Sequence, residues 1–213
     1  MSAQSLIVIG AGGHAKVLLD ALTLVGANVL GLTDVDPARL GRTVRGVPVL
    51  GGDEVVWRYA PGEVGLVNGV GSVGSTQLRT SIHRRFTQEG YAFVSVIHRA
   101  AVISPSAIIQ PGAQVMAGAV VQADAMIDED TIVNTGATVD HDCRVGKHVH
   151  LAPGVTLSGG VTIGDETHVG SGATIVQGVR IGVGCIVAAG AVVLVDVVDG
   201  VRVAGVPARE MIA

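Results

Sequence analysis

Hydrophobic residues in the second half of the chain recur at every sixth position. From Ile97 to Val193, all seventeen positions on this step are Ile, Leu or Val. The residue four positions after each of these anchors is always Ala, Cys, Thr or Val, and the residue three positions after it is Gly in nine of the seventeen repeats. Strands of a β-sandwich would instead alternate with period two and would be joined by loops of varying length. The pattern therefore predicts a regular repeat and not a sandwich.

Each six-residue unit is expected to form one short strand and one sharp corner. The branched anchor points inward, the small residue fills the narrow space beside the next anchor, and Gly supplies the positive φ that a tight corner requires. Three units close one triangular coil, and coils stacked about 4.8 Å apart satisfy their backbone groups by pairing with the coils above and below. The spacing predicts a parallel β-helix but does not specify its handedness.

The first part of the chain shows short apolar runs that alternate with helical periodicity. Strands are expected at residues 6–9, 29–33, 64–70 and 92–98, and helices after the first strand and over residues 75–89. The expected buried faces of the two helices consist of Val17, Leu18, Ala21, Leu22 and Val25, and of Leu78, Ile82 and Phe86. Strand, glycine-rich turn, helix and strand in this order are typical of a small parallel α/β sheet.

The aromatic residues divide the chain at the same place as the two patterns. All five of them precede residue 94, and residues 94–213 contain none. A narrow prism lined by small and branched residues has no room for aromatic side chains. We therefore expect a Rossmann-like α/β domain over residues 1–96 and a β-helix over residues 97–213.

Charge and hydropathy exclude several classes of protein. Fourteen basic and eighteen acidic residues give a net charge of −4, which argues against a nucleic-acid groove. No uninterrupted run of about 18 apolar residues is present, which argues against a membrane span. The N-terminus lacks the basic region of a signal peptide, and two cysteines do not make a disulfide framework. A cytoplasmic protein is expected. Cys143 and Cys185 occupy the position four residues after an anchor, which holds small inward-facing residues, so they are expected to be core residues.

His141 and Asp142 are the strongest candidates for catalysis. They occupy the two corner positions of their repeat, so both side chains are expected to project outward at an edge of the prism. An imidazole with a pKa near neutral can accept a proton, and an adjacent carboxylate can orient the ring and raise its basicity. On the spacing alone, a solvated corner that has no catalytic role is favoured over a catalytic pair.

Three further histidines allow more than one interpretation. His150 and His168 are 18 residues apart and are expected to stack one coil apart, and His148 lies close by in the sequence. They could form a wall of a cofactor groove, share a zinc ion across a subunit interface, or be exposed polar residues.

The glycine-rich turn at residues 10–15 follows a strand and opens a helix, which is the context of a phosphate-binding turn. Asp34 follows the second strand, as does the ribose-binding acid of a Rossmann unit. Nicotinamide binding is the obvious alternative, but only about 90 residues precede the repeat, too few for a second mononucleotide-binding half.

The repeat resembles the left-handed β-helix of the hexapeptide-repeat acyltransferases. The repeats follow the pattern Leu/Ile/Val-Gly-x-x-Ala-x, and residues 205–209 are similar to the Gly-x-Pro-Ala-Lys/Arg segment after that helix. With the turn Gly10-Ala11-Gly12-Gly13-His14-Ala15, the whole chain is similar to nucleotide-sugar N-acetyltransferases of the bacillosamine and perosamine type. This resemblance implies left-handed winding and a homotrimer with active sites at subunit interfaces. It also implies acetyl-CoA as co-substrate, no metal, and a role in polysaccharide biosynthesis.

The resemblance also implies roles for individual residues. His141 would be the proton acceptor, oriented by Asp142. The cofactor contacts would be His150, Ser171, Ala189 and Gly190. The nucleotide-sugar contacts would be Gly12, Gly13 and His14 at the phosphates, Asp34 at the nucleoside, and Gly71.

The expected reaction moves acetyl from acetyl-CoA to the 4-amino group of a nucleotide-linked dideoxy sugar, either GDP-perosamine-like or a UDP-4-amino sugar. Three alternatives remain open from the sequence. They are a sialic-acid-type O-acetyltransferase, a zinc lyase of the β-helix carbonic anhydrase kind, and a nucleotide-sugar sensor that uses the prism only for trimerisation.

Overall fold

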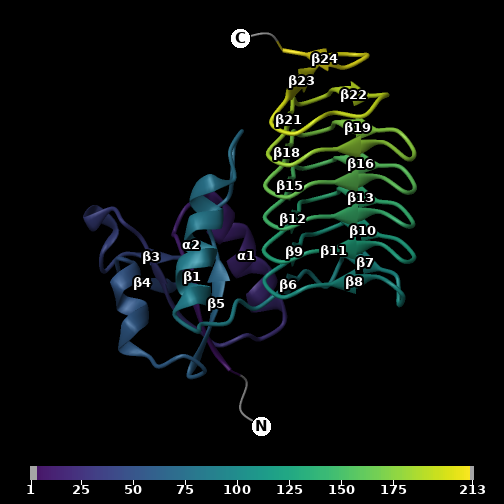
Figure 1. Cartoon of the computed structure of the whole chain (residues 1–213). Coiled ribbons are helices and arrows are strands. Elements are labelled where there is room, and N and C mark those ends of the chain that lie inside the picture. The colour runs from purple at the N-terminus through teal and green to yellow at the C-terminus, as the bar shows by residue number, and fades with distance from the viewer. Residues whose placement is uncertain (1–3, 212–213) are drawn as a thin grey trace.

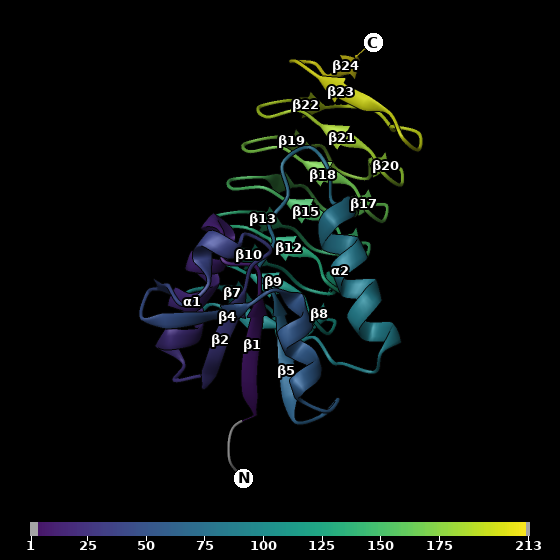
Figure 2. The same ribbon diagram turned by 90° about the vertical axis from the view of Figure 1, so that its left-hand side faces the viewer.

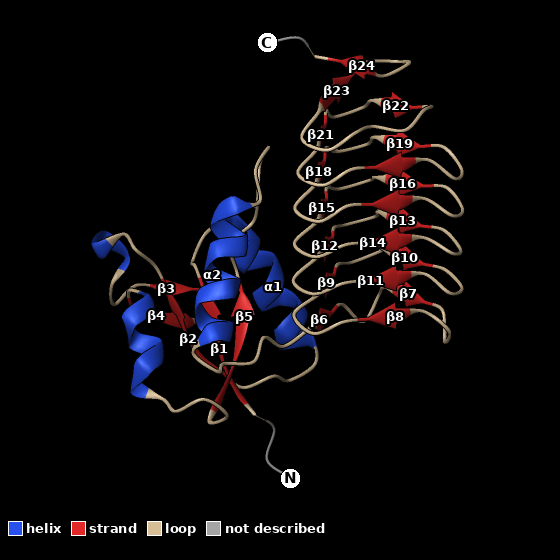
Figure 3. Cartoon of the chain, in the orientation of Figure 1, coloured by secondary structure: helices blue, strands red, loops and turns tan. Residues whose placement is uncertain are grey.

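A computed structural model describes residues 4–211 of the chain, which form an α/β domain beside a tall stack of triangular coils (Figure 1). Both helices longer than two turns belong to the first of these two parts (Figure 3). After a quarter turn of the molecule, the α/β domain is seen to cover the lower coils, while the coils nearest the C-terminus rise beyond it (Figure 2).

The N-terminal sheet has five strands in the order β3-β4-β2-β1-β5. Its strands are β1 Ser5–Ile9, β2 Val29–Thr33, β3 Thr43–Val44, β4 Val47–Gly51 and β5 Val64–Asn68. All neighbours pair in parallel except β3, which is antiparallel to β4. The helical segments are α1 Gly13–Leu24, α2 Gln77–Gln88 and the 3-10 turns η1 Pro37–Arg39 and η2 Asp53–Arg58.

Both faces of this sheet are covered, as in a doubly wound fold. On β1, Leu6 and Val8 pack with α1, whereas Ile7 and Ile9 pack with α2 on the other face. Strands buried on both faces have continuous apolar runs, which is why β1 shows no alternation in the sequence. The Rossmann-like expectation is confirmed.

Several details of this domain differ from the expectations. Strands β3 and β4 were not anticipated, because Gly and Pro interrupt their short apolar run. The expected strand at 64–70 ends at Asn68, and the one at 92–98 is reduced to β6 at Val96–Ile97, because Phe93 makes only an isolated bridge to β5.

The expected helix faces were wrong at three positions. Val17, Val25 and Leu78 are exposed. Helix α1 instead buries Ala15, Leu18, Leu19, Ala21 and Leu22. Helix α2 turns the residue after Leu78, Arg79, into the interior, so a charged side chain takes the place expected for a leucine.

The second part is a left-handed parallel β-helix built from three sheets of two-residue strands. The sheet that faces the α/β domain, called here the domain-facing sheet, contains β6 Val96–Ile97, β9 Gln114–Val115, β12 Ile132–Val133, β15 His150–Leu151, β18 His168–Val169 and β21 Ile186–Val187. The second sheet contains β7 Val102–Ile103, β10 Val120–Val121, β13 Thr138–Val139, β16 Thr156–Leu157, β19 Thr174–Ile175 and β22 Val192–Val193. The third sheet contains β8 Ile108–Ile109, β11 Met126–Ile127, β14 Arg144–Val145, β17 Thr162–Ile163 and β20 Arg180–Ile181.

The register confirms the predicted coil of three six-residue units. From β6 to β19, each strand pairs in parallel with the strand 18 residues later, for example His150 with His168, whereas β21 pairs with β23 at a step of 16. The aliphatic anchors are buried from Val115 onward, and only Ile97, Ile103 and Ile109 are partly exposed. Those three belong to the first coil, which has no coil beneath it to cover its interior.

The corners use the conformation that the glycine pattern predicts. All nine of the predicted corner glycines have positive φ, and Asp124, Asp130, Asp142, His148 and Glu166 adopt the same conformation without being glycine. Cys143 and Cys185 are buried in the small column, as expected. After the last coil, β23 Arg202–Ala204 continues the domain-facing sheet, and β24 Arg209–Glu210 folds back against it.

Three edges separate the three sheets, and each is named here by one residue. The Pro153 edge, between the domain-facing and second sheets, includes Thr135, Pro153, Ser171 and Ala189. The His141 edge, between the second and third sheets, includes His141 and Asp142. The Asp130 edge, between the third and domain-facing sheets, includes Asp130, His148 and Glu166.

A buried polar network fixes the α/β domain to the β-helix. Arg79 of α2 and Asp130 of the β-helix are both fully buried, with Nη2 and Oδ1 2.7 Å apart. The Arg79 guanidinium also donates to the carbonyls of Asn68 and Val70, and the Asp130 carboxylate accepts from Asn68 and pairs with His148. Since these partners come from both parts of the chain, the network sets the position of one part on the other.

Candidate functional site

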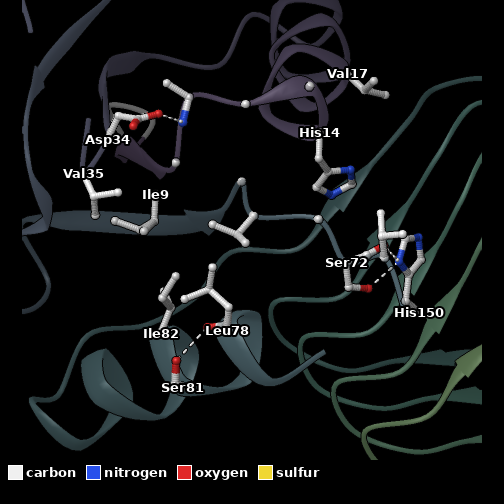
Figure 4. Close-up of a pocket in the computed structure, with 18 of the residues that line it drawn as sticks. Ile9, His14, Val17, Asp34, Val35, Ser72, Leu78, Ser81, Ile82 and His150 are labelled. Carbon is white, nitrogen blue, oxygen red and sulfur yellow. Dashed lines mark hydrogen bonds between the residues drawn. The ribbon is translucent and has the colours of Figure 1, made fainter. Parts of the chain in front are cut away.

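A cavity of about 900 Å³ lies where the α/β domain meets the domain-facing sheet. Its walls are the glycine-rich turn after β1, the loop after β5, the exposed face of α2 and part of the Pro153 edge. In Figure 4, Asp34 and Val35 lie at one end of the cavity, and His14, Ser72 and His150 lie at the end nearer the β-helix. The exposed apolar residues Val17 and Leu78 also line it, which accounts for their position outside the core.

The glycine-rich turn offers open backbone donors to this cavity. Gly12 caps α1 without any side-chain hydrogen bond, and the first helical turn contains no acidic residue. A Cβ atom built on Gly12 or Gly13 would meet no protein atom within 4 Å, and neither residue has positive φ. The fold itself therefore does not require these two glycines. Free N–H groups and the helix dipole at this end suit an anionic group such as a phosphate.

Asp34 connects the turn to the loop after β2. Its carboxylate accepts hydrogen bonds from the backbone N–H groups of Ala11 at 3.2 Å and Asp36 at 2.9 Å. The Arg39 guanidinium lies 3.5 Å from the same carboxylate and donates to the carbonyl of Ala11. Asp34 thus holds the turn in place while its side chain lines the cavity, where each oxygen can accept one further hydrogen bond.

His14, the second residue of α1, lies between the turn and the β-helix. Its Nε2 is 2.6 Å from Oε1 of Gln114, a buried residue of the domain-facing sheet. Burial, and then the charge of Arg79, lower the pKa of His14 to about 4, so the ring is neutral at pH 7. Gly71 packs closely against this ring, because a Cβ atom there would lie 3.1 Å from the Cβ of His14.

His150 is held by residues from both parts of the chain. Its Nδ1 is 2.6 Å from Oγ of Ser72, and its Nε2 is 3.0 Å from Nδ2 of Asn134. Asn134 Oδ1 accepts from the N–H of Thr135, so Nδ2 is the amide atom that faces His150 and donates to it. Burial, and then the neighbouring His168, lower the pKa of His150 to about 3. His150 is therefore a neutral, oriented part of the cavity wall.

The other two histidines of this group lie elsewhere. His168 lies one coil from His150, as predicted from the spacing, and the two rings meet edge to face with centroids 5.1 Å apart. His148 is on the Asp130 edge, where its Nδ1 is 3.0 Å from the Asp130 carboxylate, and it is buried. Within residues 4–211, no group of three or more His, Cys, Asp or Glu side chains is arranged to hold a metal ion.

The Pro153 edge extends the cavity along the β-helix. Thr135 and Pro153 line the cavity, and Ser171 and Ala189 follow at the same corner position in the next two coils. Gly190, at the corner beside Ala189, donates its N–H to the carbonyl of Ser171 at 2.9 Å. The three predicted residues beyond His150 are exposed, and they form one continuous row that starts at the cavity.

His141 and Asp142 form a pair on a different edge. Their side chains are 54% and 66% exposed, and Nδ1 of His141 is 2.7 Å from Oδ2 of Asp142. The hydrogen bond that His141 donates to Asp142, and then the charge of Asp140, raise the pKa of His141 above its ordinary value. The imidazole lies directly over Gly159, where a Cβ atom would come within 2.6 Å of the ring. The pair does not line the cavity of its own chain, since the width of the second sheet separates the two edges.

Several residues in or next to the cavity were not expected from the sequence. Ser72, Asn134 and Thr135 carry no local motif, although Asn134 and Thr135 occupy outward positions next to a predicted corner. Gln114 is polar on a strand of the β-helix, and its burial depends on a domain contact that no spacing reveals.

The described residues include no helix with the length and apolarity needed to cross a lipid bilayer. Residues 5–86 match the family described as the PglD N-terminal domain. Among curated proteins, no sequence matches the chain.

Solved structures match nearly the whole chain. A histidine-to-asparagine variant of perosamine N-acetyltransferase from Caulobacter crescentus, in complex with CoA and GDP-perosamine, is 40% identical, with a TM-score of 0.91 over 98% of this chain and 97% of that chain. The acetyltransferase domain of PglB from Neisseria gonorrhoeae, in complex with acetyl coenzyme A, is 38% identical, with a TM-score of 0.90 over 99% of this chain and 100% of that chain. WeeI from Acinetobacter baumannii is 25% identical, with a TM-score of 0.85 over 98% of this chain and 100% of that chain. With these similarities and the architecture above, the chain belongs to the nucleotide-sugar N-acetyltransferases of the hexapeptide-repeat superfamily.

Proposed function

We propose that the protein transfers acetyl from acetyl-CoA to the 4-amino group of a nucleotide-linked dideoxy sugar, and that the acceptor resembles GDP-perosamine. The main support is that one cavity joins the open N-terminus of α1, whose geometry suits an anionic group, to the edge of the β-helix. The Caulobacter relative, 40% identical, has both CoA and GDP-perosamine bound. Because both co-substrates are activated metabolites, we place the reaction in the cytoplasm and its product in polysaccharide assembly.

In this proposal the acceptor lies along the cavity, with its nucleoside near Asp34 and its phosphates at Gly12 and Gly13. The sugar then extends past His14 and Gly71 toward the β-helix. Acetyl-CoA would follow the Pro153 edge past His150, Ser171, Ala189 and Gly190. The exposed backbone of this row offers N–H and C=O groups to an extended ligand that carries amide groups.

The proposed base must come from a second copy of the chain. His141 is on a different edge from the cavity, so one protomer alone does not bring its imidazole to the sugar. A ring of three prisms would place the His141 edge of one protomer beside the Pro153 edge of the next. We therefore propose a homotrimer with each active site shared between two subunits.

The chemistry follows from the tautomer of His141. Because Nδ1 faces the Asp142 carboxylate, Nδ1 carries the proton and Nε2 has a free lone pair. The amine attacks the carbonyl carbon of the thioester, and Nε2 takes the proton that the nitrogen loses as the C–N bond forms. The C–S bond then breaks, and the departing CoA sulfur takes the proton back from the imidazolium.

An acceptor screen tests this proposal. GDP-perosamine, a UDP-linked 4-amino sugar and a sialic acid are each incubated with acetyl-CoA, and release of the CoA thiol is followed together with the mass of the product. We expect turnover with an amino sugar linked to GDP. Turnover with sialic acid alone would favour O-acetylation, and binding of a nucleotide sugar without any thiol release would favour a sensor.

Mixed trimers test whether the site is shared. Gly12→Leu fills space that no protein atom occupies, so it is expected to block the acceptor without disturbing the fold. His141→Asn removes the base. Co-expression of the two inactive variants in equal amounts should restore about a quarter of the activity, because that fraction of interfaces pairs an intact cavity with an intact His141. Activity that stays at the level of the separate variants would place both functions in one subunit.

The pH dependence of the reaction should report the His141–Asp142 pair. The base acts only when unprotonated, so kcat/KM should rise with pH, with a midpoint above the ordinary histidine value because Asp142 raises the pKa of His141. Asp142→Asn should move this midpoint to lower pH and also reduce the maximum rate, since a neutral amide stabilises the imidazolium less than a carboxylate does. Equal midpoints in both proteins, measured with the same acceptor, would show that another group is titrating.

A further inference from the structure

The orientation of one buried amide determines which ring nitrogen of His14 carries the hydrogen. Nε2 of Gln114 donates to the carbonyl oxygen of Asn68 at 2.8 Å. A carbonyl can only accept a hydrogen bond, so the amide nitrogen of Gln114 must face Asn68. Its Oε1 therefore faces His14, and the amide cannot turn over without placing two acceptors against each other.

This orientation fixes the tautomer of the His14 ring. Oε1 of Gln114 lies 2.6 Å from Nε2 of His14, which must carry the hydrogen because its partner can only accept. The lowered pKa keeps the ring neutral, so it has one N–H only. Nδ1 is consequently a bare acceptor, and it has no hydrogen-bond partner among residues 4–211.

The bare nitrogen is poorly suited to a phosphate. Phosphodiester oxygens carry no hydrogen at neutral pH, so they and Nδ1 would be two acceptors facing each other. The backbone N–H groups at the start of α1 are the donors available for phosphates. In Figure 4, His14 lies on the β-helix side of the turn, away from Asp34 and toward Ser72 and His150. The group that reaches this place in the proposed complex is the sugar.

We propose that Nδ1 of His14 accepts a hydrogen bond from a hydroxyl of the sugar, and that Gln114 is the positioning residue that holds the ring in this tautomer. The inference rests on the proposed function for the identity of the ligand. It differs from the phosphate contact that the family resemblance implies for His14. His14 would then distinguish the nucleotide sugar from the free nucleotide.

Two substitutions at His14 separate the two nitrogens of the ring. His14→Asn retains a possible acceptor at the Nδ1 position, and His14→Gln retains a donor toward Gln114 but has no acceptor at Nδ1. Calorimetry with GDP-perosamine and with GDP gives the affinity with and without the sugar. We expect His14→Gln to weaken GDP-perosamine about five- to tenfold, the effect of one hydrogen bond, and to leave GDP within about twofold. His14→Asn should bind GDP-perosamine within about threefold of the unsubstituted protein.

The outcomes distinguish this inference from the proposed function. An equal loss of affinity for GDP and GDP-perosamine would overturn the sugar contact, as would unchanged affinity in His14→Gln. If the unsubstituted protein bound none of a panel of GDP- and UDP-linked amino sugars, the proposed function would fail and the sugar contact with it. Nitrogen NMR of labelled histidine, recorded on the free protein and the complex, tests the tautomer without activity. A proton on Nδ1 of His14 at pH 7 would refute the inference, and Gln114→Met should shift this signal if Gln114 sets the tautomer.

Discussion

Replacing His141 with asparagine should lower kcat by about 10²–10⁴-fold, the usual contribution of a general base. Asparagine cannot accept the proton that the amine loses, so the tetrahedral intermediate would have to release it to water. The side chain of His141 is exposed and contacts little besides Asp142 and Gly159, so the free energy of unfolding should not change. Steady-state kinetics with acetyl-CoA and the acceptor, together with thermal unfolding, measure both effects.

A second histidine of the β-helix provides the control. His98 follows the first anchor, and its Nδ1 accepts from the N–H of Ala100 without an acidic partner. His98→Asn retains a side-chain acceptor and should leave kcat unchanged. If His141→Asn kept full activity, the base would have to be sought elsewhere, and the raised pKa of His141 would describe only a surface pair.

The β-helix was predictable because its repeat gives each position a fixed environment. An anchor such as Val139 points inward and is buried wherever there is a coil above it and a coil below it. The position of His141 within the six-residue repeat places it at an outward corner, so its side chain is exposed. The exceptions, at Ile97, Ile103 and Ile109, arise because the first coil has an open end. The six-residue repeat also explains why His141 is separated from the Pro153 edge, since His141 and Pro153 occupy different corners of the triangular coil.

The α/β domain was predictable only in outline. The apolar run of β1 and the turn after it identified the sheet and its phosphate-binding end. The spacing of apolar residues did not predict which face of α2 is buried, because Arg79 is buried by its pairing with Asp130, a residue 51 positions away in the sequence. Helical periodicity treats a charged residue as a surface residue, and so it assigned Leu78 to the core in place of Arg79.

Some residues of the cavity were predictable one by one, but the cavity that they form together was not. The glycine-rich turn, Asp34 and His150 were each expected to bind a ligand, yet their assembly depends on how the two parts of the chain dock. The hydrogen bond between His14 and Gln114 joins residues 100 positions apart, and no local pattern contains it. Asp130 does not reveal the docking in the sequence either, because Asp124 and Asp142 also replace a corner glycine, adopt the same positive φ and are exposed.

Breaking the buried pair of Arg79 and Asp130 should have the largest effect on stability. In Arg79→Met the methionine can occupy the same space, but Asp130 keeps a buried negative charge whose remaining partners among residues 4–211 are the Asn68 amide and His148. Removing one partner of a buried ion pair costs about 3–5 kcal/mol. Denaturant unfolding followed through Trp57, the single tryptophan and a residue of the α/β domain, measures this loss.

A matched variant on the same helix separates this effect from the loss of any arginine. Arg84 pairs with Glu166 at 2.6 Å, but the two side chains are 58% and 29% exposed. Water screens such a pair, so Arg84→Met should cost less than about 1 kcal/mol.

The double variant Arg79→Met with Asp130→Asn removes both charges, and asparagine tolerates the positive φ of this corner. It should be more stable than Arg79→Met alone, because an unpaired buried charge is more costly than a buried amide with hydrogen-bond partners. A double variant less stable than Arg79→Met would mean that the shape of the network, and not its charge, holds the two parts of the chain together.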